Sequence, residues 1–510
     1  MIGILLNDNG YEQDIRELLM AFFPGEGFVY EKVPDMSLCV VGKLSKDRKS
    51  FFIQVVFRGG EHCCFRSIIP AERRELDHFD EPMAVDYDNR AETKNKIKRR
   101  LYVILKAVTG KSLPWGSLTG IRPAKIALTL LEEGKSEAEI TEYMKEMYFV
   151  SDEKLRLCVE TAKQERQLLS RFFTHAGKPA DKDLKGWSFE KGYSLYVGIP
   201  FCPTTCLYCS FTSYPIEKWT GHLKDYLDAL FYELDYVAEQ AGRHPSSVYV
   251  GGGTPTSLPL HELRLFLEKL TSAFDCAGAA EFTVEAGRPD SITREKLALL
   301  RQFGVTRISI NPQTMNQKTL DLIGRRHTVE DVKERFWMAR ELGFENINMD
   351  LIVGLPEEDA DDVQRTMEAV KALGPDSLTI HSLAIKRAAR LNTMREVYKA
   401  YKITGTWEII DMTARYARDM GLKPYYLYRQ KNMAGNFENV GYASPGKACI
   451  YNILIMEEQQ TIIGCGAGTT TKRVIPGENR IERCENVKNV EQYIERIHEM
   501  TERKQRLLED

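Results

Sequence analysis

The stretch Tyr196-Val-Gly-Ile-Pro-Phe-Cys-Pro-Thr-Thr-Cys-Leu-Tyr-Cys-Ser-Phe211 decides the fold of this chain. It places Cys202, Cys206 and Cys209 within eight residues, directly after an apolar run (193–199) that is typical of a buried strand. Closely spaced cysteines on one loop are the usual ligands of an iron–sulfur cluster. Three thiolates would leave one iron of a four-iron cluster without a protein ligand, and that iron could bind a small molecule.

Two other interpretations of the three cysteines remain open. A structural zinc site needs four ligands, usually as two pairs, and the sequence holds no second CxxC or HxxxH pair. Simple buried thiols would not explain three cysteines in a loop that also contains Pro and Thr. The spacing therefore favours an open 4Fe–4S cluster.

Strands and helices alternate after this loop, a pattern typical of parallel strands joined by crossover helices. The expected strands are 193–199, 247–250, 281–285, 306–311, 346–353 and 377–383, and the expected helices are 223–240, 260–274, 292–303, 329–342 and 361–373. Six such units predict an α/β fold, either an open doubly wound sheet or an incomplete (β/α)6 TIM-like barrel.

A chemically conspicuous group lies within or directly after each expected strand. In chain order these groups are the cysteines, Gly251-Gly-Gly-Thr-Pro-Thr256, Glu285, Gln313, Asp350 and His381. Because the loops after the strands of an α/β barrel converge on one face, the groups predict a single site.

The Gly triplet and the two carboxylates each allow a functional and a structural interpretation. Consecutive glycines let backbone amides approach a ligand, but Gly-Gly-Gly-Thr-Pro is also a simple turn. Glu285 and Asp350 suit the hydroxyl and ammonium groups of a nucleoside-derived cofactor, or they cap helices and pair with cations. His327 and His381 are individually more typical of structural histidines.

A basic cluster, Lys386-Arg387-Ala-Ala-Arg390, follows the sixth strand. It is either a solvated loop or a site for a polyanionic substrate, because guanidinium groups pair bidentately with carboxylates. Arg429 and Lys431 are the next candidates for that role.

The flanking regions give three expected domains: 1–180 (α+β), 185–390 (the barrel) and 391–510 (a small α/β extension covering the substrate). In the first, strands are expected at 1–6, 27–33, 38–44, 51–58 and 62–68, and helices at 11–23, 94–108, 123–133, 137–148 and 152–172. The loop 114–123 either packs Trp115 against helices or binds a ligand, and 174–192 reads as a linker. In the last, we expect helices at 394–400 and 406–420, a hairpin of 449–456 and 459–463, a tight loop at 464–468 and one helix over 491–508.

Composition limits the function classes. A net charge of −3 gives no electrostatic footprint for nucleic acid, and no apolar run reaches the length of a membrane span. Eleven cysteines without a basic, apolar leader argue against a disulfide framework. We therefore expect a cytoplasmic protein that binds neither nucleic acid nor a membrane.

Taken together, the motifs between about 190 and 475 resemble the radical SAM superfamily, and within it the oxygen-independent coproporphyrinogen III oxidases (coproporphyrinogen dehydrogenases) of the HemZ-type branch. The resemblance rests on Tyr196-x-Gly-Ile-Pro-Phe-Cys, Gly-Gly-Gly-Thr-Pro-Thr, Gln313, Gly324-Arg325-x-His327, Asp350-Leu-Ile-Val-Gly-Leu-Pro356 and Gly464-Cys-Gly-Ala-Gly468. The segment Trp115-Gly-Ser-Leu-Thr-Gly-Ile-Arg-Pro123 also suits that branch.

The resemblance implies a 4Fe–4S cluster held by the three cysteines and bound S-adenosylmethionine, with Tyr196 also acting in catalysis. The residues implied to line the S-adenosylmethionine sites are Tyr196, Tyr208, Gly252, Gly253, Thr254, Glu285, Gln313, Arg325, Asp350, Ala384 and Thr470. The implied reaction removes a hydrogen atom from a propionate of a tetrapyrrole, and loss of carbon dioxide and one electron then leaves a vinyl group. Two propionates react in this way, which gives protoporphyrinogen IX. An unidentified electron donor is implied as a partner.

Two departures from the family pattern bear on the substrate. Phe211 stands where the characterised oxidases carry a further cysteine, and Gly198 stands where they carry a histidine. The related heme-chaperone branch also has Phe at the first position. Its His-Asn-x-x-Tyr-Trp pattern, however, appears here as Glu438-Asn-Val-Gly-Tyr-Ala443, without the histidine that would bind heme iron. A heme chaperone, or a radical enzyme acting on another tetrapyrrole, is the alternative.

Overall fold

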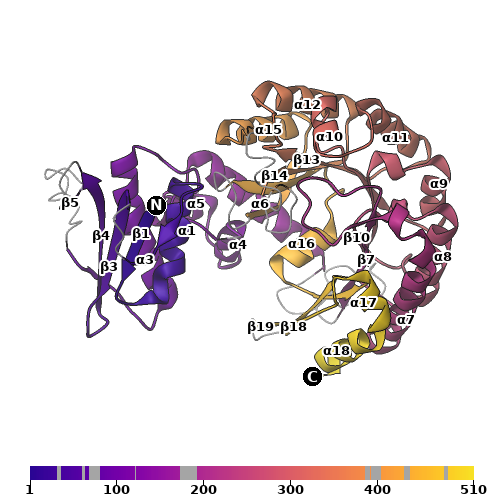
Figure 1. The fold of residues 1–510 in the computed structure, drawn as a ribbon, viewed down its shortest axis with the longest axis horizontal. Helices are drawn as coiled ribbons and strands as arrows, with labels where there is room; N and C mark the ends of the chain where they lie inside the picture. The colour runs from indigo at the N-terminus through magenta and orange to yellow at the C-terminus, as the bar shows by residue number, and fades with distance from the viewer. Residues whose placement is uncertain are drawn as a thin grey trace. The chain divides into compact units, whose positions relative to one another are not determined.

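The computed structural model describes residues 1–31, 36–59, 64–67, 81–120, 122–172, 192–384, 391, 402, 404–429, 437–475 and 480–509. The chain forms two compact units, one of Met1–Val159 with Arg429–Phe437 and one of Glu160–Tyr428 with Glu438–Asp510 (Figure 1). The expected linker 174–192, the basic cluster 386–390, Lys431 and the expected helix 394–400 lie wholly or mostly outside the described residues.

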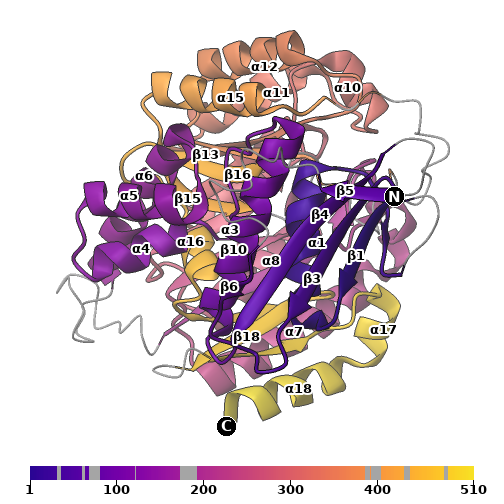
Figure 2. The ribbon, with the colours of Figure 1, turned by 90° about the vertical axis from the view of Figure 1, so that its left-hand side faces the viewer.

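The first unit is built on a sheet in the order β2-β1-β3-β4-β5, with β6 also pairing with β4 (Figure 2). Its strands are β1 (Ile2–Leu6), β2 (Phe28–Val29), β3 (Leu38–Leu44), β4 (Ser50–Gly59), β5 (Cys64–Ser67) and β6 (Met83–Ala84). Its helices are α1 (Glu12–Phe22), α3 (Arg90–Thr109), α4 (Ala124–Glu132) and α5 (Glu137–Tyr148), and α6 (Asp152–Phe172) leads into the second unit.

Local sequence signals explain these helices. Asn89 accepts a hydrogen bond from the Glu92 amide at the start of α3, and Ser136 and Glu139 form a capping box on α5. The buried faces of α1 and α3 pack with β1, β3 and β4 in one apolar core. The expected helices and most expected strands of this region are confirmed, although β2 is shorter than predicted.

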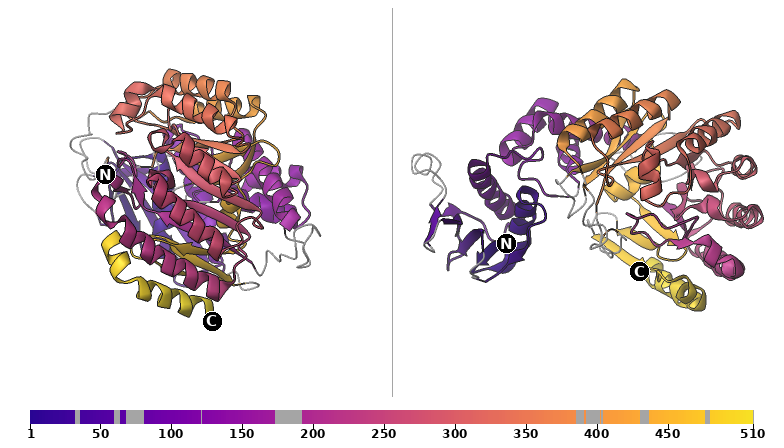
Figure 3. Two further views of the ribbon diagram at one scale, coloured as in Figure 1. Left: turned by 90° about the vertical axis from the view of Figure 1, so that its right-hand side faces the viewer. Right: turned by 45° about the horizontal axis from the view of Figure 1, so that its top comes forward.

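The second unit contains the six predicted parallel strands as neighbours in chain order. They are β7 (Tyr193–Ile199), β10 (Ser247–Gly252), β11 (Glu281–Gly287), β12 (Arg307–Ile310), β13 (Ile347–Val353) and β14 (Ser377–Ser382). The helices are α7 (Leu223–Ala241), α8 (Leu260–Ala273), α9 (Arg294–Gln302), α10 (Gln317–Leu322), α11 (Val329–Glu341) and α12 (Ala360–Leu373), and they lie along the outer side of the sheet (Figure 3). This arrangement confirms the incomplete α/β barrel.

Further strands extend the sheet beyond both ends of the six. At one end β16 (Glu438–Ala443) pairs antiparallel with β14, followed by β15 (Lys423–Arg429), which comes after α15 (Trp407–Asp419). At the other end β17 (Thr461–Cys465) pairs parallel with β7, and β18 (Thr470–Ile475) and β19 (Arg480–Glu485) follow it. The described residues of this unit thus form an 11-stranded sheet.

Two predictions for the C-terminal region are wrong. The run 449–456 is not a hairpin strand but the helix α16 (Ile450–Glu457), because a short apolar run does not distinguish a buried helix from a strand. The Ile450 amide at the start of this helix donates to the Glu281 carboxylate at 3.0 Å, which satisfies one of the amides that a helix start leaves unpaired. The expected helix 491–508 is two helices, α17 (Val490–Glu495) and α18 (Ile497–Glu509), separated at Arg496.

No helix among the described residues has the length and apolarity to cross a lipid bilayer.

Candidate active site at the ends of the barrel strands

The cysteine loop begins where β7 ends. Its start, β8 (Phe201–Cys202), pairs with β9 (Tyr214–Pro215), so the loop is closed at its base. Leu207 is buried in an apolar cluster, and its amide donates to Ile323 O at 3.0 Å. Cys206 is buried, whereas Cys202 and Cys209 are half-buried. The loop is therefore anchored at its base and in its middle, with the cysteines between the two anchors.

The Gly triplet supports this loop from the end of β10. The amides of Gly253 and Thr254 donate to Ile199 O and Phe201 O at 2.8 and 2.7 Å. A Cβ atom at Gly253 would lie 2.6 Å from Phe201 O, so this close approach requires glycine. The Thr254 hydroxyl oxygen lies 3.5 Å from the Cys202 sulfur. Packing against the cysteine loop thus accounts for one glycine of the triplet without a ligand.

Two buried guanidinium groups face the sulfur of Cys206. Arg288 Nη1 lies 3.6 Å from that sulfur, and Arg325 Nη1 lies 3.8 Å from it. Arg325 Nη1 also donates to the Tyr208 hydroxyl at 3.3 Å, and its Nη2 donates to Asn311 O. Two cationic donors directed at one sulfur stabilise a thiolate, the form in which cysteine binds iron.

The three thiols fit an iron–sulfur cluster. Burial raises the pKa of the Cys202 thiol to about 12 and also raises that of Cys209, so cluster binding would displace protons from them. Among the described residues, no three His, Cys, Asp or Glu side chains lie close enough together to hold a single metal ion. Cluster ligands need not converge in that way, since each binds a different iron.

The carboxylates at the ends of β11 and within β13 differ in protonation. Burial, followed by the charge of Asp350, raises the pKa of Glu285 to about 7, and the Tyr249 hydroxyl donates to its Oε1 at 2.6 Å. Burial opposes ionisation of Asp350 as well, but contacts with His381 (3.9 Å) and Asn348 (2.7 Å) hold its pKa below the ordinary value.

Gln313 has the features of a ligand-binding residue. It adopts a left-handed backbone conformation (φ 68°) and bridges β13 through hydrogen bonds to Asp350 O and from the Ile352 amide, both 2.9 Å. Its side-chain Oε1 is buried and has no hydrogen-bond partner among the described residues. A buried acceptor without a partner is costly unless a ligand hydroxyl or ammonium group donates to it. Gln313 therefore fits the bound S-adenosylmethionine that the sequence predicted.

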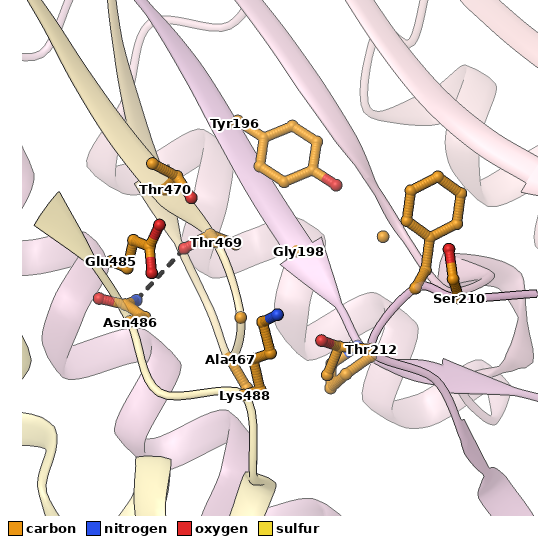
Figure 4. A pocket seen from close by; sticks show the side chains of 14 residues that line it. Tyr196, Gly198, Ser210, Thr212, Ala467, Thr469, Thr470, Glu485, Asn486 and Lys488 are labelled. Carbon is orange, nitrogen blue, oxygen red and sulfur yellow. Dashed lines mark hydrogen bonds between the residues drawn. The ribbon is translucent and has the colours of Figure 1, made fainter. Parts of the chain in front are cut away.

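A cavity of about 270 Å³ adjoins the cysteine loop (Figure 4). Its walls come from β7, from the cysteine loop and from the turns before β18 and after β19; the residues are Tyr196, Gly198, Pro200, Ser210, Phe211, Thr212, Gly252, Ala467, Gly468, Thr469, Thr470, Glu485, Asn486 and Lys488. Lys488 reaches in from one rim with its ammonium group toward Gly198 (Figure 4). Tyr196 and Gly252 of the predicted S-adenosylmethionine site, and Thr470, thus share one cavity with a lysine.

The remaining predicted site residues lie as follows. Tyr196 packs beside the stacked rings of Tyr249 and Tyr451, with its ring centroid 6.0 and 5.9 Å from theirs. Ala384 is half-buried just after β14. His327 is buried 3.8 Å from Asp290, and His381 lies 3.5 Å from the Tyr428 hydroxyl.

Arg429 does not fit the substrate role considered for it. It is buried, donates to Leu118 O at 2.7 Å and lies over the Trp115 ring at 5.3 Å. Trp115 is itself buried, and its ring contacts Arg429 of β15; the interpretation that it packs against helices stays a prediction.

Sequence reasoning missed Arg288, Asp290 and Lys488. The first two stand in Gly287-Arg-Pro-Asp290 directly after the third barrel strand, where the rule that singled out Glu285 could have found them. Lys488 belongs to the C-terminal extension, and no local sequence pattern predicts that this extension packs beside β7.

Comparisons with known proteins agree with these features. Residues 196–370 match the family model of the radical SAM superfamily. The chain is 41% identical over 425 residues to the oxygen-independent coproporphyrinogen-III oxidase-like protein HemZ of Bacillus subtilis (strain 168), covering 82% of this chain and 81% of that protein. The heme chaperone HemW of the same organism is 35% identical over 195 residues, 38% of this chain and 51% of that protein. The oxygen-independent coproporphyrinogen III oxidase of Escherichia coli (strain K12) is 34% identical over 196 residues, 38% of this chain and 42% of that protein.

Proposed function

The chain belongs to the radical SAM superfamily and, within it, to the family of HemZ- and HemN-like coproporphyrinogen oxidases, and from that membership we propose that it oxidatively decarboxylates coproporphyrinogen III to protoporphyrinogen IX. The superfamily uses a 4Fe–4S cluster and S-adenosylmethionine. The observation that carries the proposal is the cavity beside the cysteine loop, because it places a lysine ammonium group next to the predicted radical-generating site.

The residues of the chain would divide the work as follows. Cys202, Cys206 and Cys209 would hold the cluster. The cluster and bound S-adenosylmethionine together would supply an organic radical that abstracts a hydrogen atom. Gln313 Oε1 and the ionised Asp350 would accept hydrogen bonds from the hydroxyl and ammonium groups of the bound S-adenosylmethionine. The walls of the cavity would limit access of water to the reacting carbon.

Lys488 would bind a carboxylate of the tetrapyrrole. It is the one basic residue among the described residues that line the cavity, and its ammonium group has no hydrogen bond or ion pair with another described residue. An ammonium–carboxylate contact is worth about 1.5–3 kcal/mol, less when it stays solvated. Because Lys488 is exposed, solvent screening reduces this contribution to about 1 kcal/mol or less.

Turnover by the full chain tests the proposal. Cluster-loaded protein, kept anaerobic, is given coproporphyrinogen III, S-adenosylmethionine and a chemical reductant, and the porphyrins are separated after oxidation. We expect loss of two carboxyl groups per tetrapyrrole and none with Cys206→Ala. Lys488→Gln should raise the KM for the tetrapyrrole about two- to fivefold, by loss of one solvent-exposed charged contact, and leave cleavage of S-adenosylmethionine without substrate unchanged.

The control for Lys488 is Lys224→Gln, which changes an exposed lysine on α7 that pairs with Asp228. Equal KM values for the wild type, Lys488→Gln and Lys224→Gln would show that Lys488 does not bind the substrate. A modified product that keeps all its propionates would point to a different tetrapyrrole reaction.

A heme chaperone is the second candidate, since HemW proteins are among the relatives. The residues at its heme-binding pattern fit poorly, however. Glu438 and Asn439 are buried in β16, where Ser382 donates its hydroxyl to Glu438 O and its amide to the Asn439 side chain, both at 2.9 Å. Stoichiometric binding of heme, without turnover of the tetrapyrrole, would favour the chaperone and contradict the oxidase.

A further inference from the structure

Arg288 occupies a turn that directs its side chain to the cysteine loop. β11 ends at Gly287 with a positive φ of 44°, and the Arg288 amide then donates back to Ala286 O at 2.6 Å. Pro289 opens a short 3-10 helix (Pro289–Ser291) immediately afterwards. The turn therefore places Arg288 at the end of a barrel strand, with a side chain that is only 4% exposed.

Every nitrogen of the Arg288 guanidinium has an acceptor. Nε and Nη2 donate to the two oxygens of Asp290 at 3.0 and 2.7 Å, which fixes the plane of the group. Nη1 donates to the backbone and side-chain oxygens of Thr204 at 2.9 and 2.7 Å and points to the Cys206 sulfur at 3.6 Å. Thr204 in turn donates to Gly324 O at 2.8 Å. The contacts with Asp290 and Thr204 therefore fix the orientation of Nη1 toward the Cys206 sulfur.

This geometry has an electrostatic consequence for whatever Cys206 binds. Asp290 balances the charge of Arg288, but it contacts the guanidinium through Nε and Nη2, whereas Nη1 faces the sulfur. The pair therefore forms a dipole whose positive end is directed at Cys206 in a buried site, where such fields are weakly screened. Hydrogen bonds to the cluster sulfurs and local charge are among the factors that set the potential of an iron–sulfur cluster.

We propose that Arg288 is a positioning residue that fixes the Cys206 sulfur and raises the reduction potential of the cluster bound there. When the cluster gains one electron its negative charge grows, and a donor fixed on a ligand sulfur stabilises the reduced form more than the oxidised form. Arg325 donates to the same sulfur at 3.8 Å, but it also contacts Tyr208, so it is left unchanged in the test.

The test is a redox titration of the cluster-loaded full chain, followed by electron paramagnetic resonance of the reduced cluster in the absence of substrate. In Arg288→Gln the guanidinium charge is lost, and the midpoint should move to a more negative potential. At the wild-type midpoint we expect the ratio of reduced to oxidised cluster to fall about tenfold, which is about 59 mV for a one-electron couple. The measurement needs no tetrapyrrole, so its outcome is independent of the proposed oxidase activity.

Two further variants complete the experiment. Arg294→Gln makes the same change in an exposed arginine that pairs with Glu341, and its midpoint should equal that of the wild type. Arg288→Lys keeps the charge but cannot reproduce the planar fork, so its midpoint should lie below that of the wild type and above that of Arg288→Gln. If Arg288→Gln folds poorly, the shift of Arg288→Lys relative to the wild type is the test. An unchanged or more positive midpoint in a cluster-loaded Arg288 variant would overturn the proposal.

Discussion

Two carboxyl groups at the end of the barrel, those of Glu285 and Asp350, have different pKa values because their hydrogen-bond partners and neighbouring charges differ. Burial, together with the charge of Asp350, raises the pKa of Glu285 to about 7, although the hydrogen bond from the Tyr249 hydroxyl acts in the opposite direction. Asp350, equally enclosed, keeps a pKa below the ordinary value because His381 lies 3.9 Å from it and Asn348 donates to it. Near neutral pH, Asp350 is ionised while Glu285 is divided between its two forms, so Glu285, unlike Asp350, can make cation binding depend on pH in this range.

We therefore predict that the affinity for S-adenosylmethionine rises between pH 6 and pH 8. With a raised pKa, Glu285 is protonated at the lower pH and cannot pair with a cation; its ionised fraction grows about tenfold over this range, and we expect affinity to follow. Equilibrium dialysis of cluster-loaded protein measures this. Glu285→Gln should abolish the pH dependence, whereas Glu334→Gln, on the surface of α11, should retain it. A flat profile in the wild type would exclude Glu285 from the cofactor site.

At the scale of elements, β7 is the strand on which the site depends, because β10 and β17 both pair with it in parallel. The loop after β17 approaches β7 so closely at Gly198 that a Cβ atom there would lie 2.6 Å from Thr469 Cγ2. The next nearest atoms, Cys465 O and Tyr196 Cε1, are 3.7 Å away. A single methyl group, that of Thr469, is thus the main obstacle to a side chain at position 198.

This contact predicts that the effects of two substitutions are not additive. Gly198→Ala should destabilise the protein by about 1–3 kcal/mol through overpacking against Thr469. Thr469→Ser removes the obstructing methyl and keeps the hydroxyl that donates to Gly466 O at 2.8 Å, so the double variant should be more stable than the sum of the single effects. Urea unfolding of the four proteins measures the coupling. Additive losses would show that Thr469 does not restrict this position.

The elements also show what the sequence could and could not predict. The repeating units of the barrel were predictable because each joins a short apolar strand to a helix with its own start and stop signals; Thr328 and Asp331, for example, form a capping box on α11. The helix α16 was not predictable, since the apolar run 450–457 fits a strand as well as a helix and only packing decides between them. Arg288 was missed because its role depends on a contact with Cys206, 82 residues away in the sequence. Lys488 was missed because only the folded chain brings it to the cavity beside β7.

Within the second unit as a whole, a buried ionic network ties the C-terminal helices to the barrel. Lys504 of α18 donates to Glu233 of α7 at 2.6 Å and to Asn486 at 2.7 Å, and both charged side chains are almost fully buried. Glu233 also accepts from the Gly466 amide at 2.7 Å, at the turn that leads into the cavity wall. The network therefore connects the closing helix of the chain to a wall of the candidate site.

Removing one partner of this network should be costly. Lys504→Met leaves the Glu233 carboxylate buried without its counter-charge, which we expect to destabilise the unit by about 3–5 kcal/mol. Adding Glu233→Gln should recover much of that loss, because no unpaired charge remains. Thermal unfolding of the single and double variants tests this, with Lys224→Met as a surface control. A single variant as stable as the control would mean that the Lys504–Glu233 pair contributes little.

The pairing of β7 with β17 also constrains how the protein is made. The ribosome completes β7 at Ile199, but the strand that covers one of its edges begins only at Thr461. At 5–20 residues per second, that edge stays without its partner for roughly 13 to 52 seconds. An apolar strand with an uncovered edge is a template for pairing with other chains. Nascent chains halted before residue 461 would carry this exposed edge, so premature termination in that interval should yield products prone to aggregation or dependent on chaperones.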